Sequence, residues 1–367
     1  MPDYSTRLSK LKPLGTVALV PGASLKYFTG LNFHLSERPI VFFVGTFGMA
    51  AIVPELEASR ITARDDLDVT LFTWRDEQGY EGAFQAAIDT LKLADSPLGV
   101  DGMTMRVTEL LTLQALEPSL SVRAVEQDLI AIRAHKDAAE VDALRRAIAI
   151  SEKALTTVLA QLKEGLSERD IARLLSDALV AEGSQGASFS PLVQLGENSA
   201  FPHGSITERA LRPGDIVLID FGAIYQGYPA DITRTVCFGE PSEEFQKMFA
   251  AVLAANEAAI AISKPGVAMQ AVDRAARQVI EDAGYGEYFI HRTGHGLGLD
   301  VHEPIPQIAE GVEQVLEPGM VFTIEPGVYI PGVGGVRLED DVLVTEQGLD
   351  VLTSFPKAWQ LSEVLAT

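Results

Sequence analysis

Arg212 to Gly222 reads RPGDIVLIDFG, and Glu317 to Gly327, 105 residues further on, reads EPGMVFTIEPG. Each stretch has a Pro-Gly turn, then an apolar run typical of a buried strand, then an acid, Asp220 or Glu325. The two stretches are near-copies, so the sequence predicts a duplicated fold with an acid at the same place in each half.

A second acid follows each copy on the next strand-like run, Asp231 in ADITRTVCF and Glu339 in GVRLEDDVLV. An exposed surface charge is the simplest reading of any single acid. That reading fails for Asp220 and Glu325, because each ends an apolar strand where an unpaired charge is costly. Four carboxylates gathered by a duplicated fold predict a site for two metal ions, which lie ~3.5–4 Å apart in two-metal hydrolases.

The duplication extends to helical segments. Residues 165–183 (GLSERDIARLLSDALVAEG) match residues 266–284 (GVAMQAVDRAARQVIEDAG), and both have a Gly turn, a helix and a closing Gly. Each half is therefore a helix, then strands, then an acid. We expect the halves to form one pseudo-twofold domain with the site between them.

The residues before the repeat predict a separate α/β domain. Its segments PGASLKYFTGL (21–31), PIVFFVG (39–45) and MAAIVP (49–54) are expected to be strands or turns, and residues 81–93 are expected to be a helix. The charged segment RAHKDAAE (133–140) then opens a long amphipathic helix. We place the boundary there, which gives domains of residues 1–132 and 133–367.

Charge and composition exclude several classes of protein. The chain has 29 basic and 51 acidic residues and a formal net charge of −22, a surface that repels nucleic acid. Its first residues have no signal-peptide pattern, and the apolar stretch from Pro39 to Pro54 is too short to span a membrane. The one cysteine, Cys237, excludes an intramolecular disulfide and is expected to be a packed apolar residue. We expect a cytoplasmic protein with no membrane partner.

Four of the six histidines lie in the second domain between residues 203 and 302: His203, His291, His295 and His302. Three flank or lie within the glycine-rich stretch HRTGHGLGLDVHE, whose glycines let the backbone approach a bound group closely. A phosphate-binding loop is the alternative, but no G-K-[ST] or dinucleotide spacing follows. Carboxylates with one imidazole suit manganese, iron, cobalt or zinc. His34 and His135 are expected at the surface.

Four segments together resemble the creatinase, aminopeptidase P, prolidase and methionine aminopeptidase group, the "pita-bread" metallopeptidases. They are HRTGHGLGLDVHEP, FTIEPGVYI, GGVRLEDDVLVT and DFGAIYQGYPADITRT. The resemblance covers the whole second domain, and the first domain is similar to the creatinase-type N-terminal domain. It implies an α+β protein in which a smaller α/β domain precedes a pseudo-twofold pita-bread catalytic domain.

The resemblance also implies roles for individual residues. Asp220 would chelate one metal ion, Asp231 and Glu339 would bridge both, and His295 and Glu325 would complete the other. Glu325 would also act as general base and then general acid. The non-ligand histidines of the family match His203 and His302, which would steady the scissile carbonyl and the oxyanion. Arg337 matches an arginine that contacts the carboxylate ligands.

The particular motifs favour an enzyme that cuts the Xaa-Pro bond, a tertiary amide without an N–H. Methionine aminopeptidases usually lack the large first domain, and creatinases have lost the ligands. The modest length slightly favours a dipeptidase (prolidase) over an aminopeptidase P. However, residues 303–322 contain no Lys or Arg to bind a substrate carboxylate. Either Arg292 or a cation of a partner subunit does so, or longer peptides are accepted.

Two further readings stay open: a hydrolase of another C–N bond, and a non-catalytic interaction module, which ligand loss would have favoured. The expected cofactors are two divalent ions, with manganese preferred and cobalt or zinc as alternatives. The expected partners are Xaa-Pro dipeptides or peptides with Pro second, and a second copy of the chain in a homodimer.

Overall fold

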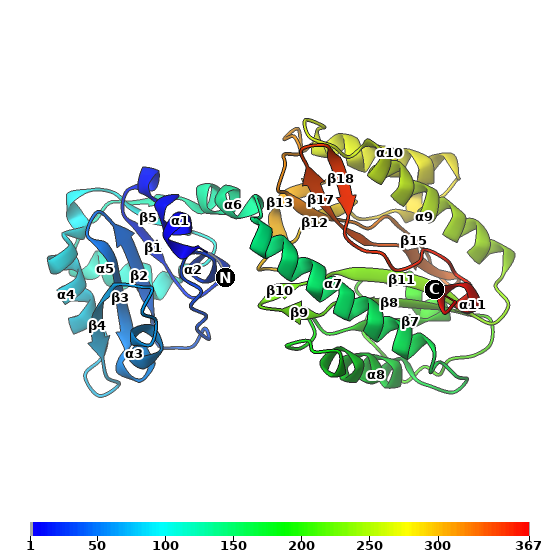
Figure 1. Cartoon of the computed structure of the whole chain (residues 1–367), viewed down its shortest axis with the longest axis horizontal. Coiled ribbons are helices and arrows are strands. Elements are labelled where there is room, and N and C mark those ends of the chain that lie inside the picture. Colours follow the sequence, from blue (N-terminus) through cyan, green and yellow to red (C-terminus); the bar gives the residue numbers. More distant parts are fainter. Residues whose placement is uncertain (1–2, 367) are drawn as a thin grey trace. The chain divides into compact units, whose positions relative to one another are not determined.

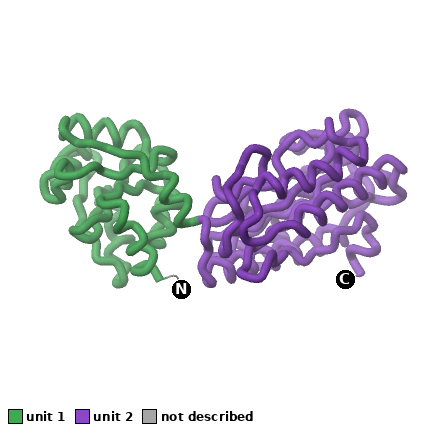
Figure 2. Tube along the Cα trace, turned by 90° about the horizontal axis from the view of Figure 1, so that it is seen from above, with its two compact units in different colours: residues 1–133 green, residues 134–367 purple. Residues whose placement is uncertain are grey.

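The computed structural model describes residues 3–366 and divides the chain into two compact units, residues 1–133 and 134–367 (Figure 2). Each unit has its own sheets and its own buried apolar residues (Figure 1).

Unit 1 is built on a mixed six-stranded sheet in the order β4-β3-β2-β1-β5-β6. Its strands are β1 (Val17–Leu19), β2 (Val41–Gly45), β3 (Gly48–Pro54), β4 (Val69–Trp74), β5 (Leu98–Val100) and β6 (Val122–Ala124). Its helices are α1 (Tyr4–Ser9), α2 (Ala23–Thr29), α3 (Glu55–Thr62), α4 (Glu81–Leu91), α5 (Val107–Leu116) and α6 (Glu126–Ala134), the last crossing into unit 2. Strands β2 and β3 confirm the strands expected for residues 39–45 and 49–54, and they form an antiparallel pair that ends at Gly45 and Gly48.

One prediction for unit 1 is wrong. The segment 21–31, expected to be strand or turn, contains helix α2. Gly22 precedes the helix, and Gly30 ends it in the left-handed conformation that favours glycine. Leu25 and Phe28, three residues apart, are fully buried on one face. A seven-residue helix between two glycines is too short for its periodicity to be recognised in the sequence.

Unit 2 contains two pairs of long helices, α7 with α8 and α9 with α10, which lie outside the strands (Figure 1). The helices are α7 (Ala138–Leu159), α8 (Glu168–Ala181), α9 (Glu243–Ile262), α10 (Met269–Asp282) and the short α11 (Leu361–Val364). Helix α7 begins at the capping box of Asp137 and Glu140, which confirms the long helix predicted after the charged segment.

The strands of unit 2 form a three-stranded sheet, β11-β8-β7, a five-stranded sheet, β13-β12-β14-β17-β18, and the ribbons β9–β10 and β15–β16. The first set is β7 (Leu192–Leu195), β8 (Asp215–Phe221), β9 (Ile224–Tyr225), β10 (Tyr228–Pro229) and β11 (Ile232–Phe238). The second set is β12 (Gly294–Gly296), β13 (Glu303–Ile308), β14 (Val321–Ile324), β15 (Gly327–Ile330), β16 (Gly334–Arg337), β17 (Asp340–Thr345) and β18 (Gly348–Val351).

The internal repeat of the sequence is repeated in the structure. In the two Pro-Gly turns, Gly214 and Gly319 both have φ +90°, a conformation that strains any residue with a side chain. The backbone N–H of Gly165 donates to the carbonyl of Leu211, and the N–H of Gly266 donates to Leu316, each over 2.9 Å. In each half, the turn before the second helix is therefore hydrogen-bonded to the equivalent residue, Leu211 or Leu316.

Helix α9 is long and apolar enough to cross a membrane by length and composition alone. Phe245, Met248, Val252 and Ala255 are nevertheless buried along one face, in the cluster that also contains Phe322 of β14. This arrangement is that of a core helix packed on a sheet.

Candidate metal centre

All the residues predicted to form the site line one cavity of about 830 Å³ in unit 2. They are His203, Asp220, Asp231, His295, His302, Glu325, Arg337 and Glu339. The cavity is also lined by His291, Arg292, and the apolar or small residues Phe189, Leu192, Pro202, Gly204 and Val301.

Strand ends bring the four acids together. Asp220 lies near the end of β8, and Asp231 comes directly before β11, which pairs antiparallel with β8. In the second half, β14 pairs antiparallel with β17, with Ile324 opposite Asp340. Glu325 and Glu339 are the next residues beyond that pair. The apolar residues of these strands are buried in the core, which fixes the position of the backbone. Because the acids lie at the ends of paired strands, the pairing brings their carboxylates close together.

The acids and His295 are close enough to share metal ions. Ligand atoms of Asp220, Asp231 and Glu339 lie within 4.8 Å of one another, and so do those of His295, Glu325 and Glu339. His295 Nε2 is 3.6 Å from Asp231 Oδ2 and 3.5 Å from Glu325 Oε1. Hard carboxylate oxygens with one imidazole form a donor set that fits divalent Mn, Fe, Co or Zn.

The imidazole of His295 is held in the form that binds a metal. Its Nδ1–H donates to the carbonyl of Gly296 over 3.0 Å, which leaves Nε2 facing the carboxylates without a proton. Burial, aided by the neighbouring His302, lowers the pKa of His295 to about 3, so the ring is neutral at physiological pH.

Without a cation, the cluster of acids is electrostatically costly. Burial and the neighbouring carboxylates raise the pKa of Asp231 and of Glu339 well above the ordinary values, and burial raises the pKa of Glu325 to about 7. Among the described residues, Asp220 Oδ1 is buried and has no hydrogen-bond partner. A divalent cation would offset the repulsion and supply that partner, so the residues fit a metal centre.

Arg337 contacts the carboxylate cluster through hydrogen bonds. Its guanidinium donates to Asp220 Oδ2, to the Thr233 hydroxyl over 3.0 Å and to the Tyr329 hydroxyl over 3.0 Å. The Thr233 hydroxyl in turn donates to Glu339 Oε2 over 2.6 Å. Arg337 therefore links an acid of the first half to an acid of the second.

The two further predicted histidines line the same cavity and are exposed. His203 is exposed in the loop that follows β7, and His302 is exposed directly before β13. The ring centroid of His302 is 3.9 Å from that of His295. Possible ligand atoms of His302, Asp231 and His295 lie within 4.8 Å of one another, so these three residues could also hold a metal ion. Burial and the positive charge of Arg292 lower the pKa of His302. Both histidines can reach a molecule in the cavity.

His291, for which the sequence predicted no role in the site, also lines the cavity. Its Nδ1–H donates to the carbonyl of Arg292, and its Nε2 is 2.9 Å from the Tyr329 hydroxyl. Burial lowers the pKa of His291 to about 4, so Nε2 accepts from Tyr329. Tyr329 was missed by the sequence analysis, although it lies in the motif FTIEPGVYI.

Buried acids in the second helix of each half hold the loops of the site. Glu168, fully buried in α8, accepts from the N–H groups of Leu195 and Thr207 and from the Thr207 hydroxyl, on both sides of His203. Asp273, fully buried in α10, accepts from the N–H and hydroxyl of Thr293, two residues before His295. The sequence predicted neither, because the partners are distant in the chain.

A charged network also contacts the backbone of Glu339. Arg234 donates to the carbonyl of Glu339 over 2.6 Å and to Asp340 Oδ1 over 2.7 Å. Lys357 donates to Asp340 Oδ2 over 2.9 Å and to the side chain of Asn256 in α9 over 2.7 Å. These hydrogen bonds hold Glu339 and Asp340 in place at the start of β17.

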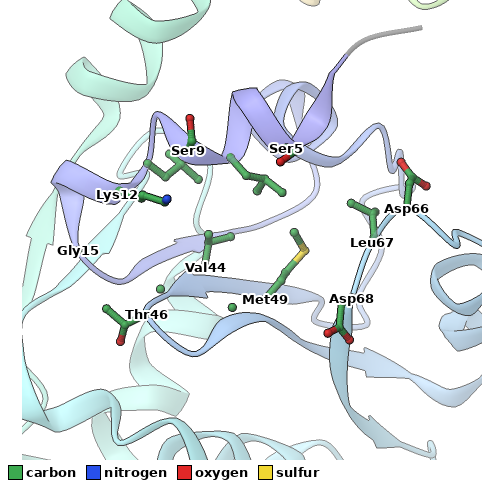
Figure 3. A pocket seen from close by; sticks show the side chains of 14 residues that line it. Ser5, Ser9, Lys12, Gly15, Val44, Thr46, Met49, Asp66, Leu67 and Asp68 are labelled. Carbon is green, nitrogen blue, oxygen red and sulfur yellow. The ribbon is translucent and has the colours of Figure 1, made fainter.

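A second cavity, of about 610 Å³, lies within unit 1 between α1, the β2–β3 turn and residues 66–68 (Figure 3). Val44, Met49 and Leu67 contribute apolar side chains, and Asp66 and Asp68 lie at one side. None of the predicted site residues lines this cavity.

The remaining predictions concern Cys237, His34 and His135. Cys237 is buried in β11, where burial raises the pKa of its thiol to about 11, and this confirms a packed residue. His34 is exposed, whereas His135 is only partly exposed because its Nδ1–H donates to the carbonyl of Pro318.

Residues 142–346 match metallopeptidase family M24. An uncharacterized peptidase of Staphylococcus aureus (strain MSSA476) is 34% identical over 332 residues, which are 90% of this chain and 92% of that protein. Recombinant prolidase from Thermococcus sibiricus is 36% identical, with a TM-score of 0.88 over 96% of this chain and 98% of that one. X-Pro aminopeptidase from Thermotoga maritima MSB8 is 30% identical, with a TM-score of 0.86 over 96% and 99%.

The chain therefore belongs to metallopeptidase family M24 and is a metallo-exopeptidase. The predicted family and the predicted α+β pita-bread fold are both confirmed.

Proposed function

We propose that the chain is an Xaa-Pro dipeptidase that depends on two divalent metal ions. The observation that carries the proposal is the single cavity that gathers four carboxylates, one neutral imidazole and two exposed histidines. The similar solved structures support it, since they include a prolidase and an X-Pro aminopeptidase.

Five residues would hold the ions. Asp220 would bind one, His295 and Glu325 the other, and Asp231 and Glu339 both, since each carboxylate has two oxygens. When bound, divalent ions polarise the scissile carbonyl and lower the pKa of water. We propose manganese as the native metal, with cobalt or zinc as alternatives, because affinity order and availability decide together.

The side chains of the cavity supply the proton transfers and the oxyanion contacts. Glu325, a largely buried carboxylate that lines the cavity, would act as the general base that takes a proton from the attacking water. The same carboxyl then delivers the proton to the leaving proline nitrogen. In an Xaa-Pro bond that nitrogen has no proton of its own. His203 and His302 would donate to the carbonyl oxygen as it gains charge.

Arg337 would act as a positioning residue for this chemistry. Its guanidinium orients Asp220 directly and Glu339 through the hydroxyl of Thr233.

An Xaa-Pro aminopeptidase of the aminopeptidase P type is the second candidate. It is favoured by the X-Pro aminopeptidase among the similar structures and by residues 303–322, which supply no cation for a substrate carboxylate. A non-catalytic interaction module is disfavoured, because all five candidate ligands are present. We further propose a homodimer in the cytoplasm, and sedimentation that showed an active monomer would contradict the homodimer.

The test is hydrolysis of the dipeptide Leu-Pro beside the tripeptide Leu-Pro-Leu, by metal-free protein with and without added Mn²⁺. We expect Mn²⁺-dependent release of proline from Leu-Pro and slower cleavage of the tripeptide. Cleavage of the tripeptide alone would make the chain an aminopeptidase. No cleavage of either peptide with metal bound would refute both candidates.

A further inference from the structure

The helices that open the two halves of unit 2 keep the offset of the acid-bearing strands. Helices α7 and α9 begin at residues 138 and 243, which are 105 apart, as are Asp220 and Glu325. At this offset Ser151 of α7 corresponds to Asn256 of α9, and both are fully buried. In α9, all of which the structure describes, the other buried residues are apolar. A buried amide is costly unless it is hydrogen-bonded, so the partners of Asn256 indicate its role.

The amide of Asn256 contacts the main chain directly before both acids of the second half. Its Nδ2 donates to the carbonyl of Ile324 over 3.1 Å and, over a longer 3.5 Å, to the carbonyl of Leu338. Each carbonyl belongs to the peptide group that leads into a candidate ligand, Glu325 or Glu339. One side chain of α9 therefore connects the two segments that carry these acids.

The other ends of the same two peptide groups are also fixed. The N–H of Glu325 donates to the carbonyl of Thr293 over 2.8 Å, and the N–H of Glu339 donates to the carbonyl of Thr233 over 3.1 Å. Each threonine lies two residues from another of the predicted ligands in the sequence. Rotation of both peptide groups is thus restrained at the carbonyl and at the N–H.

Lys357 sets the orientation of the Asn256 amide. Lys357 Nζ donates to Asn256 Oδ1 over 2.7 Å. Because an ammonium group has donors and no acceptor, the oxygen of the amide faces Lys357 and its nitrogen faces the two carbonyls. An apolar side chain at this position would present no donor to either carbonyl.

Ser151 makes a simpler contact in the first half. Its hydroxyl donates to the carbonyl of Ala147 in its own helix over 2.9 Å and accepts from the N–H of Ala223 over 2.8 Å. Ala223 follows Asp220 by three residues, so the serine fixes the chain near one acid. The asparagine of the second half instead fixes the chain at two acids.

We propose that Asn256 is a positioning residue for metal binding, which holds Glu325 and Glu339 at the separation at which their carboxylates bind a divalent ion together. It acts through the main chain, since it lies in α9 and does not line the described cavity. The inference rests on the proposed metal-dependent function and adds a residue on which metal affinity depends. Removing a residue that orients metal ligands typically lowers metal affinity by ~10- to 100-fold.

The test is calorimetric titration with Mn²⁺ of the metal-free wild type, Asn256→Leu and Val252→Ala. Leucine keeps the branching of asparagine and removes both polar groups. Val252→Ala is the matched control, because Val252 is fully buried one turn earlier on α9 and its truncation removes packing alone. We expect the Mn²⁺ dissociation constant to rise by ~10- to 100-fold in Asn256→Leu and to stay unchanged in Val252→Ala, although both changes lower the free energy of unfolding.

Asn256→Ser is the second variant, in case Asn256→Leu does not fold. It places at this position the residue found at the equivalent position of the first half, and it should weaken Mn²⁺ binding in the same direction. Circular dichroism of each metal-free protein establishes folding before the titration. Unchanged dissociation constants in the folded Asn256 variants, or an equal loss in Val252→Ala, would overturn the role of Asn256 and leave the proposed function standing.

Release of proline from Leu-Pro is measured in the same Mn²⁺-loaded samples. A wild type that binds Mn²⁺ without hydrolysing Leu-Pro would overturn the proposed function, and the dissociation constants would still decide the role of Asn256. Absence of Mn²⁺ binding by the wild type would overturn both.

Discussion

Arg337 of β16 donates a hydrogen bond to Asp220 of β8, so an arginine of the second half of unit 2 fixes an acid of the first. The other oxygen of this carboxylate, Asp220 Oδ1, is buried and has no hydrogen-bond partner among the described residues. The halves of the repeat therefore meet through a charged contact at the candidate metal centre.

Replacing Arg337 tests this link. Arg337→Met leaves Asp220 buried without its cation, and we expect a loss on the order of 3 kcal/mol in the free energy of unfolding of the metal-free protein. Metal affinity should fall by ~10- to 100-fold, because the acid is no longer oriented. Denaturant unfolding and metal titration measure the two effects. The control is Arg173→Met, whose side chain is 71% exposed; equal effects of the two changes would refute the link.

Replacing the candidate ligand Asp231 should abolish the stabilisation of the protein by Mn²⁺. In the wild type, Mn²⁺ at ~100 times its dissociation constant should add about 2.7 kcal/mol to the free energy of unfolding. Asp231→Asn removes a candidate bridging ligand and one repelling charge. We expect a metal-free protein at least as stable as the wild type that gains no stability from Mn²⁺. Asp350→Asn, at a surface ion pair, should keep the full gain in thermal unfolding. A full gain in Asp231→Asn would show that Asp231 is no ligand.

The raised pKa of Glu325 predicts a pH dependence for the metal-free protein. Burial raises this pKa from 4.5 to about 7, so the folded state holds a proton that the unfolded state releases. Its contribution to stability is present below pH 4.5 and is lost as the pH rises to about 7. Glu325→Gln should remove that loss.

The prediction is tested on the difference in unfolding free energy between wild type and Glu325→Gln. The wild-type pH profile alone is not sufficient, because two histidines change the stability in the opposite direction with pH. Burial lowers the pKa of His291 to about 4 and of His295 to about 3, and their contributions are lost as the pH falls below about 6.5. The difference in unfolding free energy between the two proteins should change between pH 4.5 and 7. A constant difference across that window would contradict the assignment.

The loop of His203 should depend on Glu168. Leu195 and Thr207 donate their N–H groups to different oxygens of Glu168, so in Glu168→Gln the amide keeps one acceptor and turns an NH2 group toward the other N–H donor. We expect a loss of ~1–3 kcal/mol in unfolding free energy, as for a buried donor left unsatisfied. We also expect a lower kcat, because His203 is no longer positioned. Asp177→Asn, exposed on the same helix, is the matched control for denaturant unfolding and for kinetics. Unchanged kcat would limit Glu168 to a structural role.

Much of the fold was predictable because its signals are local. The Pro-Gly turns around Gly214 and Gly319 and the helices α8 and α10 each have a turn residue and an apolar period of their own. Helix α2 was mispredicted because seven residues between two glycines offer less than two full turns of periodicity.

The parts of the site that the sequence did not predict depend on contacts between distant residues. Glu168 lies in an amphipathic helix where an acid is ordinarily exposed, and only the folded chain brings Thr207 to it. Tyr329 lies in a strand, and only the folded chain shows that its hydroxyl connects Arg337 to His291 by hydrogen bonds. Helix and strand periodicity carries no information on such pairs.

The most direct test of the central claim is hydrolysis of Leu-Pro by the wild type and by Glu325→Gln, each metal-free and then loaded with Mn²⁺, with bound metal measured in the same samples. We predict proline release only by the metal-loaded wild type, and a fall of at least ~100-fold in kcat for Glu325→Gln at a saturating metal concentration. Hydrolysis by the metal-free wild type, or by Glu325→Gln at the wild-type rate, would contradict the account.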